Sequence, residues 1–441
     1  MQILRANLYR LDPTTEQALF FSQTAGACRF VYNLALEQRR DWHRPGRNIT
    51  YVSQRSEITA LRAEVAWLAA APVHALQMAV WAVDAAFQRF FMGLGGYPPP
   101  RKKFRDDRFS FPDPSKLGFK RLNKNRAAVK LPKIGWVKLV GYRPLGAELR
   151  SVTIKRKAGH WYASIAWRAE VADPTPPTLP SVGLDRGVAV FAALSNGTKI
   201  KPLNAFEAIR DRLAKAQRKL ARKAKFSANW KKQKAKITRL HMRAANARKD
   251  FLQKLSTDLA KSHGVIKIEK LQIQNMTHSA NGSVDRPGTN VKAKSRLNRS
   301  ILDQGWGMFA TMLNYKLAER GGKLVYVHPA YTSQTCAECH VTDKTSRIDQ
   351  ARFVCAHCGH EDSADINGAR NIHEARALAD EPPKRILRRI GKRKPQKRLK
   401  TGKPRSLGWG ACHRTMTKGN FPTGCNGLQD WVGSQGMANR L

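Results

Sequence analysis

Apolar and polar positions repeat with two different periods along the chain. Apolar residues recur at helical spacing from Thr15 to about residue 42, and segment 52–94 shows the same pattern. Segment 151–170 (SVTIKRKAGHWYASIAWRAE) instead alternates with a period of two on both sides of a glycine-containing turn. The first two segments therefore predict helices, and the third predicts a β-hairpin.

Four prolines in segment 171–180 (VADPTPPTLP) indicate a linker, and we place a domain boundary there. Segment 205–263 contains no Gly or Pro and predicts two basic helices with a break near 226–229. A further helix is predicted over 300–322, ending at a pair of glycines. Strand patterns separate these helices at 181–200, 264–273 and 323–329. This alternation predicts an α/β sheet domain from about 181 to 375.

The charge of the chain points to its partner. The 441 residues include 80 Lys and Arg but only 32 Asp and Glu, which gives a net charge of +48. Nucleic acid fits this charge best, because Lys and Arg gain by displacing counterions from phosphates. A ribosomal-type basic protein is the alternative, and a membrane surface fits less well. The basic run at 383–405 predicts a disordered, polyanion-binding tail over 381–441.

No segment has the pattern of a membrane anchor or a secretion signal. The first residues, MQILRANLYRLDP, lack an apolar core. The most apolar stretch, 65–91, is interrupted by Pro72 and Asp84, among other polar residues. We therefore expect a cytoplasmic protein without a membrane partner.

Four of the seven cysteines form two matched pairs. Cys336, Cys339, Cys355 and Cys358 follow the pattern C-x2-C-x15-C-x2-C. Two such pairs can place four thiolates in a tetrahedron around Zn²⁺, and a closed four-sulfur set predicts a structural ion. A redox-active pair is the competing interpretation, and His340, His357 or His360 could replace one ligand. The remaining pair near the C-terminus, Cys412 and Cys425, lacks this spacing, and we assign it no metal.

Three acidic residues stand out within the predicted sheet domain. Asp185 lies in GLDRG, Glu269 lies within the strand-like VIKIEKL, and Asp365 begins the helical segment ADINGARNI. Each alone could be a solvent-exposed residue or an ion-pair partner. Together they can hold two Mg²⁺ ions about 4 Å apart and hydrolyse a phosphodiester bond. The cysteine clamp just before Asp365 would fix where that helix starts and so bring Asp365 to the other two acids.

With these residues placed, the chain resembles TnpB, the RNA-guided nuclease family encoded by insertion sequences, and the compact type V CRISPR effectors related to it. The resemblance covers most of residues 1–375. It rests on an ordered series of blocks: GACRFVYNLALE, SVTIKRKAGHWYASI, SVGLDRGV, IKIEKL, LNRSILDQGWGMFATMLNYKLAERGG, VHPAYTSQTCAECH and RFVCAHCGHEDSADINGARNI. Two positions depart from the family pattern, since His340 and Gly368 stand where glycine and alanine are usual.

The resemblance implies a multidomain fold of α/β and α+β parts. A wedge β-barrel is expected over 1–45 and 96–172, interrupted by a helical recognition insert over 46–95. A RuvC-like, RNase H-type nuclease domain is expected over 173–335 and 359–380, with the zinc ribbon (336–358) inserted in it. Asp185, Glu269 and Asp365 would be the catalytic acids that bind Mg²⁺, and Cys336, Cys339, Cys355 and Cys358 the zinc ligands.

The implied activity is RNA-guided cleavage of DNA. One protein would bind one guide RNA and cleave complementary double-stranded DNA beside a short adjacent motif, in the bacterial cytoplasm at the nucleoid. Aromatic residues of the N-terminal region could stack on bases, and examples are Tyr97, Phe104, Phe109 and Phe111. Because most aromatic residues in such stretches are ordinary core residues, we assign the role to none of them individually. Two alternatives stay open at this point: a nuclease-inactive RNA-guided regulator and a DNA-joining transposase.

Overall fold

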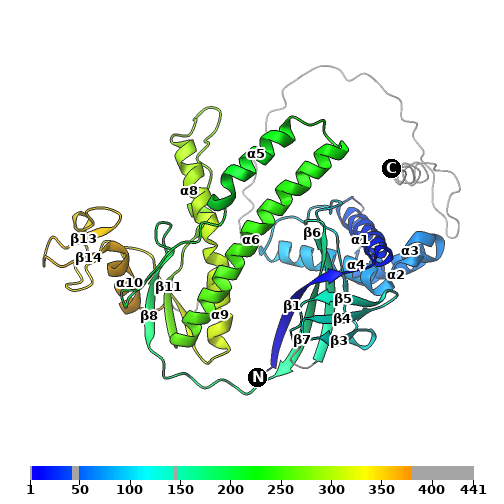
Figure 1. The fold of residues 1–441 in the computed structure, drawn as a ribbon, viewed down its shortest axis with the longest axis horizontal. Helices are drawn as coiled ribbons and strands as arrows, with labels where there is room; N and C mark the ends of the chain where they lie inside the picture. The colour runs from blue at the N-terminus through cyan, green and yellow to red at the C-terminus, as the bar shows by residue number, and fades with distance from the viewer. Residues whose placement is uncertain (1, 42–48, 144–147, 379–441) are drawn as a thin grey trace. The chain divides into compact units, whose positions relative to one another are not determined.

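The computed structural model describes residues 2–41, 49–143 and 148–378. The described residues form a seven-stranded, a five-stranded and a two-stranded sheet, and Figure 1 shows helices beside the two larger ones. The tail predicted over 381–441 lies outside the described residues, as do Cys412 and Cys425. Among the helices that the structure describes, none combines the length and the apolar character needed to cross a membrane.

The N-terminal sheet has seven antiparallel strands. It follows the order β2-β6-β7-β1-β5-β4-β3. The strands are β1 (Gln2–Asp12), β2 (Arg108–Phe111), β3 (Gly118–Asn123), β4 (Arg126–Leu131), β5 (Gly135–Val140), β6 (Glu148–Lys157) and β7 (His160–Glu170). The predicted hairpin is confirmed, because β6 pairs with β7 around a turn in which Ala158 and Gly159 have positive φ.

The hydrogen-bonded ladder of this sheet is open. Its two edge strands, β2 and β3, do not pair with each other, so the described residues do not form the closed barrel that the resemblance implied. Strand β2 is only four residues long and pairs with β6 alone. Strand β3 exposes the side chains from Lys120 to Asn123. Because β2 is short and β3 is largely exposed to solvent, these two edge strands offer little apolar surface for pairing with each other and closing the sheet.

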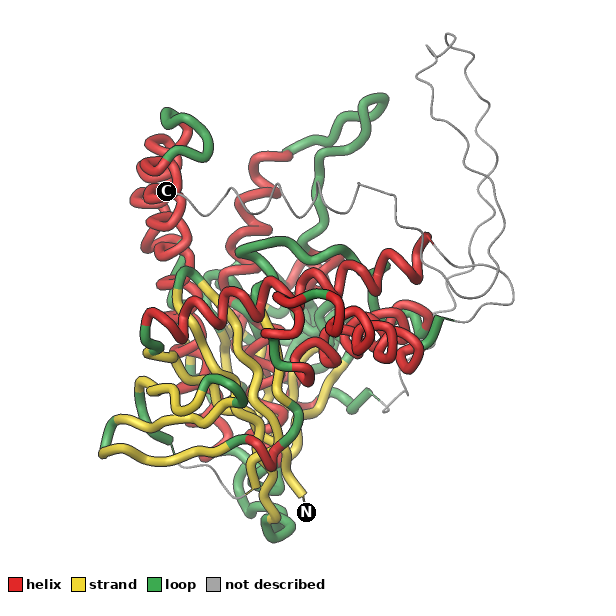
Figure 2. Tube along the Cα trace, turned by 90° about the vertical axis from the view of Figure 1, so that its right-hand side faces the viewer, coloured by secondary structure: helices red, strands yellow, loops and turns green. Residues whose placement is uncertain are grey.

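Four helices pack with this sheet around one hydrophobic core. They are α1 (Thr15–Asp41), α2 (Tyr51–Glu64), α3 (Ala66–Ala70) and α4 (Val73–Phe91). A short 3₁₀ turn, Pro114–Lys116, follows β2. The core joins Phe21 and Val31 of α1 and Leu76 of α4 to Ile154 and Ile165 of the central strands, all fully buried. Figure 2 shows these strands in yellow near the N-terminus, with helices in red lying along them.

The second sheet has five strands in the order β10-β9-β8-β11-β12. They are β8 (Ser181–Asp185), β9 (Ala192–Leu194), β10 (Lys199–Ile200), β11 (Val265–Glu269) and β12 (Lys323–Val327). Strands β8, β11 and β12 are parallel, and β9 and β10 are antiparallel to their neighbours. The predicted alternation of strands and helices is confirmed, and Leu184, Ile268, Phe191 and Phe309 lie at the centre of its core.

The helices of this region are α5 (Arg210–Ala221), α6 (Ala228–Ser262), α7 (Ile273–Met276), α8 (Val291–Gln304), α9 (Trp306–Ala318) and α10 (Ala364–Glu374), with a 3₁₀ turn at Glu207–Ile209. The two basic helices are confirmed as α5 and α6, and the Ser227 side chain caps α6 by accepting a hydrogen bond from the Trp230 amide. The single helix predicted over 300–322 is wrong. Gly305 has φ +72° and separates α8 from α9, a conformation open to glycine at little cost.

The cysteine segment forms a small ribbon of its own. It contains the 3₁₀ turn Lys344–Ser346 and the hairpin strands β13 (Arg352–Val354) and β14 (Glu361–Ser363). Phe353 is fully buried in a small cluster with Cys336, Cys355 and Ala364. Helix α10 begins directly after β14, so the ribbon leads without a linker into the helix that carries Asp365.

Candidate active site and metal centre

Two of the predicted acids end neighbouring parallel strands. Asp185 is the last residue of β8, and Glu269 is the last residue of β11. The two strands pair in parallel with Leu184 opposite Ile268, so the acids follow at equivalent positions. Because parallel strands end at the same edge of a sheet, both side chains start from one edge, where ligands of open α/β sheets bind.

Helix α10 brings the third acid to this edge. Asp365 lies in the first turn of α10, which packs against β8 and β9. The close approach depends on Gly183 of β8, because a Cβ built there would lie 2.2 Å from the carbonyl oxygen of Ala369. The negative charges of Glu269 and Asp365 both raise the pKa of Asp185, which shows that the three carboxylates share one electrostatic environment. The structure thus brings together all three predicted acids.

The carboxylate of Asp185 is strongly perturbed by its surroundings. Burial raises its pKa to about 7, with the charges of Glu269 and Asp365 adding to the effect. The positive charge of Arg347, from the ribbon, acts in the opposite direction. The backbone of α10 also crowds this carboxylate, since a Cβ at Gly368 would lie 3.1 Å from Asp185 Oδ2. Alanine at this position would make a tight contact here.

Glu269 is held by two neighbours. Its side chain is 8% exposed and accepts a hydrogen bond of 2.6 Å from the hydroxyl of Thr332. The buried Arg186 donates to the backbone carbonyl of Glu269, and its Nε has no partner. Burial raises the pKa of Glu269, whereas the Thr332 hydrogen bond and the Arg186 charge lower it. The arginine therefore fixes the end of β11 without forming an ion pair with the carboxylate.

The donor set suits hard divalent cations. Carboxylate oxygens are the ligands that Mg²⁺ prefers, and carboxylates that raise one another's pKa gain from a cation placed between them. In the described part of the chain, one group of possible metal ligands has all its ligand atoms within 4.8 Å of one another, and it consists of four cysteines. The carboxylate oxygens of the three acids are not that close to one another. In this structure the three acids are therefore neighbours at one sheet edge and do not form a compact set of ligand atoms.

The four cysteines form that compact group. Their sulfurs all lie within 4.8 Å of one another, with Cys336 and Cys358 3.7 Å apart and Cys339 and Cys355 3.5 Å apart. A tetrahedral ion with bonds of about 2.3 Å would separate its sulfurs by about 3.8 Å. In each knuckle a backbone amide donates to the first sulfur, Glu338 to Cys336 and Cys358 to Cys355. The cluster can therefore bind one tetrahedral metal ion.

The three histidines near this cluster are not part of it. His340 lies 3.6 Å from the carboxylate of Glu374, and His357 lies 3.5 Å from that of Asp343. His360 contributes no atom to the group of sulfurs. All four cysteines are free thiols in the structure. These observations favour four sulfur ligands over a histidine substitution or a disulfide pair.

Two asparagines of α10 tie the ribbon to the acids. Asn367 accepts from the Ala337 amide (2.8 Å) and donates to the Thr335 carbonyl (2.8 Å), on either side of Cys336. Asn371, one turn later, donates to the carbonyls of Thr332 and Thr335. The segment that begins the ribbon is thus hydrogen-bonded to the helix that carries Asp365.

Sequence analysis missed several residues of this site. The asparagines had a usable signal, because two of them four residues apart in ADINGARNI share one helix face. Thr332 and Arg347 had none, because both come from loops that only the fold brings to the sheet edge. Two of the aromatic residues considered for base stacking are excluded: Phe109 and Phe111 are 3% and 1% exposed core residues. Tyr97 and Phe104 remain exposed.

Comparisons with known proteins address the family. The model OrfB_IS605, described as "Probable transposase", matches residues 164–280, and the Cas12f1-like TNB domain matches residues 306–372. A helix-turn-helix model of the same OrfB group matches residues 1–48. "Putative RNA-guided DNA endonuclease InsQ" of Escherichia coli (strain K12) is 42% identical over 84% of this chain and 92% of its own length. The chain belongs to the TnpB family.

Other relatives match different shares of the chain. A protein of Streptomyces pristinaespiralis, also named as an RNA-guided DNA endonuclease, is 34% identical over 84% of this chain and 89% of its own length. The CRISPR-associated endodeoxyribonuclease Cas12f1 of Sulfoacidibacillus thermotolerans is 52% identical, but over 13% of this chain and 14% of its own. A solved Cas12f1–sgRNA–target DNA complex is 18% identical, with a TM-score of 0.30 over 84% of this chain and 99% of that one.

Proposed function

We propose that this TnpB-family protein is an RNA-guided DNA endonuclease whose catalytic acids are Asp185, Glu269 and Asp365. The observation that supports this most directly is the meeting of three partly or fully buried carboxylates at one sheet edge in a chain of net charge +48. Buried acids in a basic protein are costly unless cations occupy the site. The names of two relatives that match 84% of this chain agree with the proposed activity.

Divalent ions would supply the chemistry when bound, by activating a water molecule and stabilising the leaving oxygen. The role of the protein's own residues is to position the carboxylate ligands. Asp185 and Glu269 project from the rigid ends of β8 and β11, and Asp365 from the first turn of α10. The Thr332 hydroxyl holds one carboxylate oxygen of Glu269, which leaves the other free for a ligand. Arg347 brings a positive charge to the same side, suited to a scissile phosphate.

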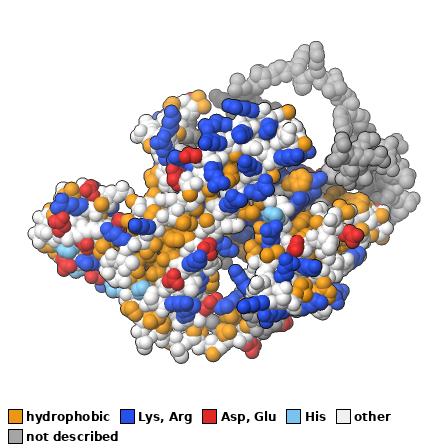
Figure 3. All heavy atoms as spheres, in the orientation of Figure 1, with side chains coloured by type: hydrophobic (Ala, Val, Ile, Leu, Met, Phe, Trp, Pro, Cys, Tyr) orange, Lys and Arg blue, Asp and Glu red, His pale blue; other side chains and the backbone are white. Residues whose placement is uncertain are grey.

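A guide RNA and a double-stranded target DNA are the proposed partners, with one protein per RNA. The segment from Arg212 to Lys249 in α5 and α6 is dense in Lys and Arg and contains no Asp or Glu. Figure 3 shows Lys and Arg side chains gathered over these helices. Such a surface binds a phosphate backbone without reading its sequence, so guide–target pairing would supply specificity. The protein would act at the bacterial nucleoid.

The proposed domains follow the sequence boundaries. The sheet and helices of 1–45 and 96–172 would form the wedge domain as a partly open barrel, with 46–95 as its recognition insert. Residues 173–335 and 359–380 would form the RuvC-like domain, and 336–358 a ribbon that binds Zn²⁺. The sulfur spacing and the hydrogen-bonded knuckles support zinc as the ion.

Cleavage by an acid variant tests the proposal. The protein, purified with RNA expressed from its own locus, is incubated with a matching DNA duplex and Mg²⁺. Asp185→Ala is expected to abolish cutting and to leave the amount of bound RNA unchanged. Asp211→Ala, which removes an exposed acid of α5, is the matched control and should cut at the wild-type rate. Cutting by Asp185→Ala at the control rate would refute the three-acid assignment.

The description of the matching family model, a transposase, favours DNA joining as a second candidate. Strand transfer and hydrolysis can use the same acids, so residue substitution does not separate them. A reaction with labelled target DNA and an unlabelled acceptor does. Labelled product longer than the substrate would establish joining, whereas cleaved ends alone support the nuclease. A protein that keeps RNA and target bound with Mg²⁺ present, yet produces neither, would be the inactive regulator.

A further inference from the structure

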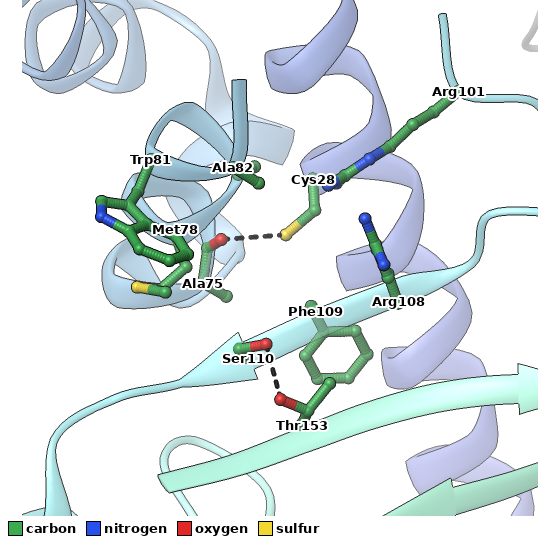
Figure 4. A pocket seen from close by; sticks show the side chains of 11 residues that line it. Cys28, Ala75, Met78, Trp81, Ala82, Arg101, Arg108, Phe109, Ser110 and Thr153 are labelled. Carbon is green, nitrogen blue, oxygen red and sulfur yellow. Dashed lines mark hydrogen bonds between the residues drawn. The ribbon is translucent and has the colours of Figure 1, made fainter. Parts of the chain in front are cut away.

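A cavity of about 240 Å³ lies between α1, α4 and β2, within the N-terminal part of the protein and separate from the acids. Figure 4 shows its lining. One side is polar, with the guanidinium groups of Arg101 and Arg108 and the hydroxyls of Ser110 and Thr153. The opposite side, from α4, is apolar and is formed mainly by Met78 and Trp81. We call it the Arg101–Arg108 pocket.

The two arginines of the pocket form no direct ion pair, although the negative charge of Asp106 lies near enough to act on Arg101. Among the described residues, no acid forms an ion pair with Arg101 or Arg108, and the neighbouring carboxylate of Asp107 is engaged by Arg29 at 2.8 Å instead. Burial lowers the pKa of Arg101 to about 10, and the charge of Arg108 contributes to this. Arg101 is partly buried and Arg108 is exposed beside it. Two guanidinium groups that repel each other gain free energy when an anion comes between them.

The pocket is also preorganised. Asn33 of α1 fixes the backbone of Arg101 from both sides, accepting from its amide at 2.8 Å and donating to its carbonyl at 3.1 Å. The guanidinium then stacks 3.8 Å from the ring centre of Tyr32. Ser110 and Thr153 share one hydrogen bond of 2.9 Å, which leaves one hydroxyl hydrogen of the pair free to donate.

We propose that the Arg101–Arg108 pocket binds one nucleotide of a nucleic acid, with its phosphate between the two arginines and its sugar and base against Met78 and Trp81. Arginine pairs suit phosphate oxygens because their donors match them bidentately. The volume corresponds to about eight water molecules at about 30 Å³ each, enough for a phosphate and a sugar. Trp81 is half-exposed at the rim, where a base can stack on it. The inference rests on the proposed function for the identity of the polymer, which is either the guide RNA or the target DNA.

Equilibrium binding without Mg²⁺ tests the pocket independently of cleavage. The double variant Arg101→Gln/Arg108→Gln removes both charges, and Arg105→Gln removes an exposed charge of the same segment that does not line the pocket. One arm titrates RNA-free protein with labelled guide RNA, and the other titrates RNA-loaded protein with labelled target duplex. We expect the double variant to bind one of the two polymers roughly tenfold more weakly, with the slope of log affinity against log salt reduced by about one. The affected arm identifies the source of the nucleotide.

Unfolding of the ligand-free protein separates binding from structure. Because the two positive charges repel each other, the double variant should unfold at the wild-type temperature or above it. If the double variant does not fold, the single variant Arg108→Gln is used in its place. Equal binding of both polymers by the double variant and Arg105→Gln would overturn the proposal. The same unfolding measurement is repeated with adenosine monophosphate added. If the double variant loses its stabilisation by this nucleotide but still binds both polymers normally, the pocket is a site for free nucleotides and the proposal is overturned. None of these outcomes depends on whether Asp185→Ala abolishes cutting.

Discussion

The raised pKa of Asp185 predicts that its charge destabilises the metal-free protein. In the folded protein the carboxyl group keeps its proton up to about pH 7, whereas its ordinary pKa is 3.8. The folded state is therefore favoured by the protonated form. This contribution to stability is fully present below about pH 4 and is lost as the pH rises through about 7. Asp185→Asn keeps the shape of the side chain and removes the loss.

The size of the effect follows from the two pKa values. The interval from 3.8 to about 7 corresponds to about 4 kcal/mol at about 1.4 kcal/mol per pH unit. This is an upper limit, because part of the carboxylate reaches solvent and is screened there. At pH 5 the destabilisation reaches about a third of this value, because only the interval between the ordinary pKa of 3.8 and pH 5 contributes. The advantage of Asp185→Asn over wild type should accordingly grow by about 1–3 kcal/mol between pH 5 and pH 8.

Thermal unfolding at the two pH values measures this directly, in buffer without added divalent cations. A domain of this size changes its midpoint by about 2–4 °C per kcal/mol, so Asp185→Asn should gain several degrees more at pH 8 than at pH 5. Asp285→Asn, at an exposed position, is the control and should show no such difference. Adding Mg²⁺ at pH 8 should raise the wild-type midpoint and close the gap. An equal advantage at both pH values would refute the electrostatic argument.

Three further changes probe the surroundings of the site. Thr332→Val removes the hydrogen bond that lowers the pKa of Glu269, so the pH of half-maximal DNA cleavage should rise; an unchanged pH profile would contradict this role. Cys336→Ser should reduce the zinc content, measured by mass spectrometry, and reduce cleavage more than RNA binding; full activity without zinc would show that the ribbon is dispensable. Gly183→Ala should lower the free energy of unfolding by about 1–3 kcal/mol and remove most of the cleavage activity, because its Cβ would lie 2.2 Å from the Ala369 carbonyl oxygen. Gly368→Ala should lower both stability and cleavage less, because its Cβ would lie 3.1 Å from a side-chain oxygen of Asp185.

The sequence was most informative where structure depends on nearby residues. The β6–β7 hairpin, the two basic helices and the cysteine knuckles each follow from a local pattern, and each is found at its predicted place. The meeting of the acids was predictable for a related reason. Asp185 and Glu269 end strands of the same parallel sheet, so their shared edge follows once the strands are recognised.

Features that depend on distant contacts were not predictable. One glycine costs a helix only about 1 kcal/mol, so the apolar pattern across Gly305 indicated a continuous helix. In the fold, Leu252 and Arg248 of α6 pack against Gly305, which adopts a left-handed conformation there. Whether the N-terminal sheet closes likewise depends on which strands pair. The short sequence of β2 did not indicate that β2 would be an edge strand. Thr332 belongs to the site only because β12 returns beside β11.

The hydrogen bonds of α10 explain why an acid follows the cysteine clamp so closely. Asn367 contacts both sides of Cys336, Asn371 holds the carbonyl of Thr332, and the hydroxyl of Thr332 holds Glu269. A continuous series of contacts thus joins the cysteines to two of the acids, because α10 itself carries Asp365. Loss of the metal would loosen the first knuckle and, through these asparagines, the position of both carboxylates. The basic helices α5 and α6 take no part in this series, which is why the ribbon should affect cleavage more than nucleic-acid binding.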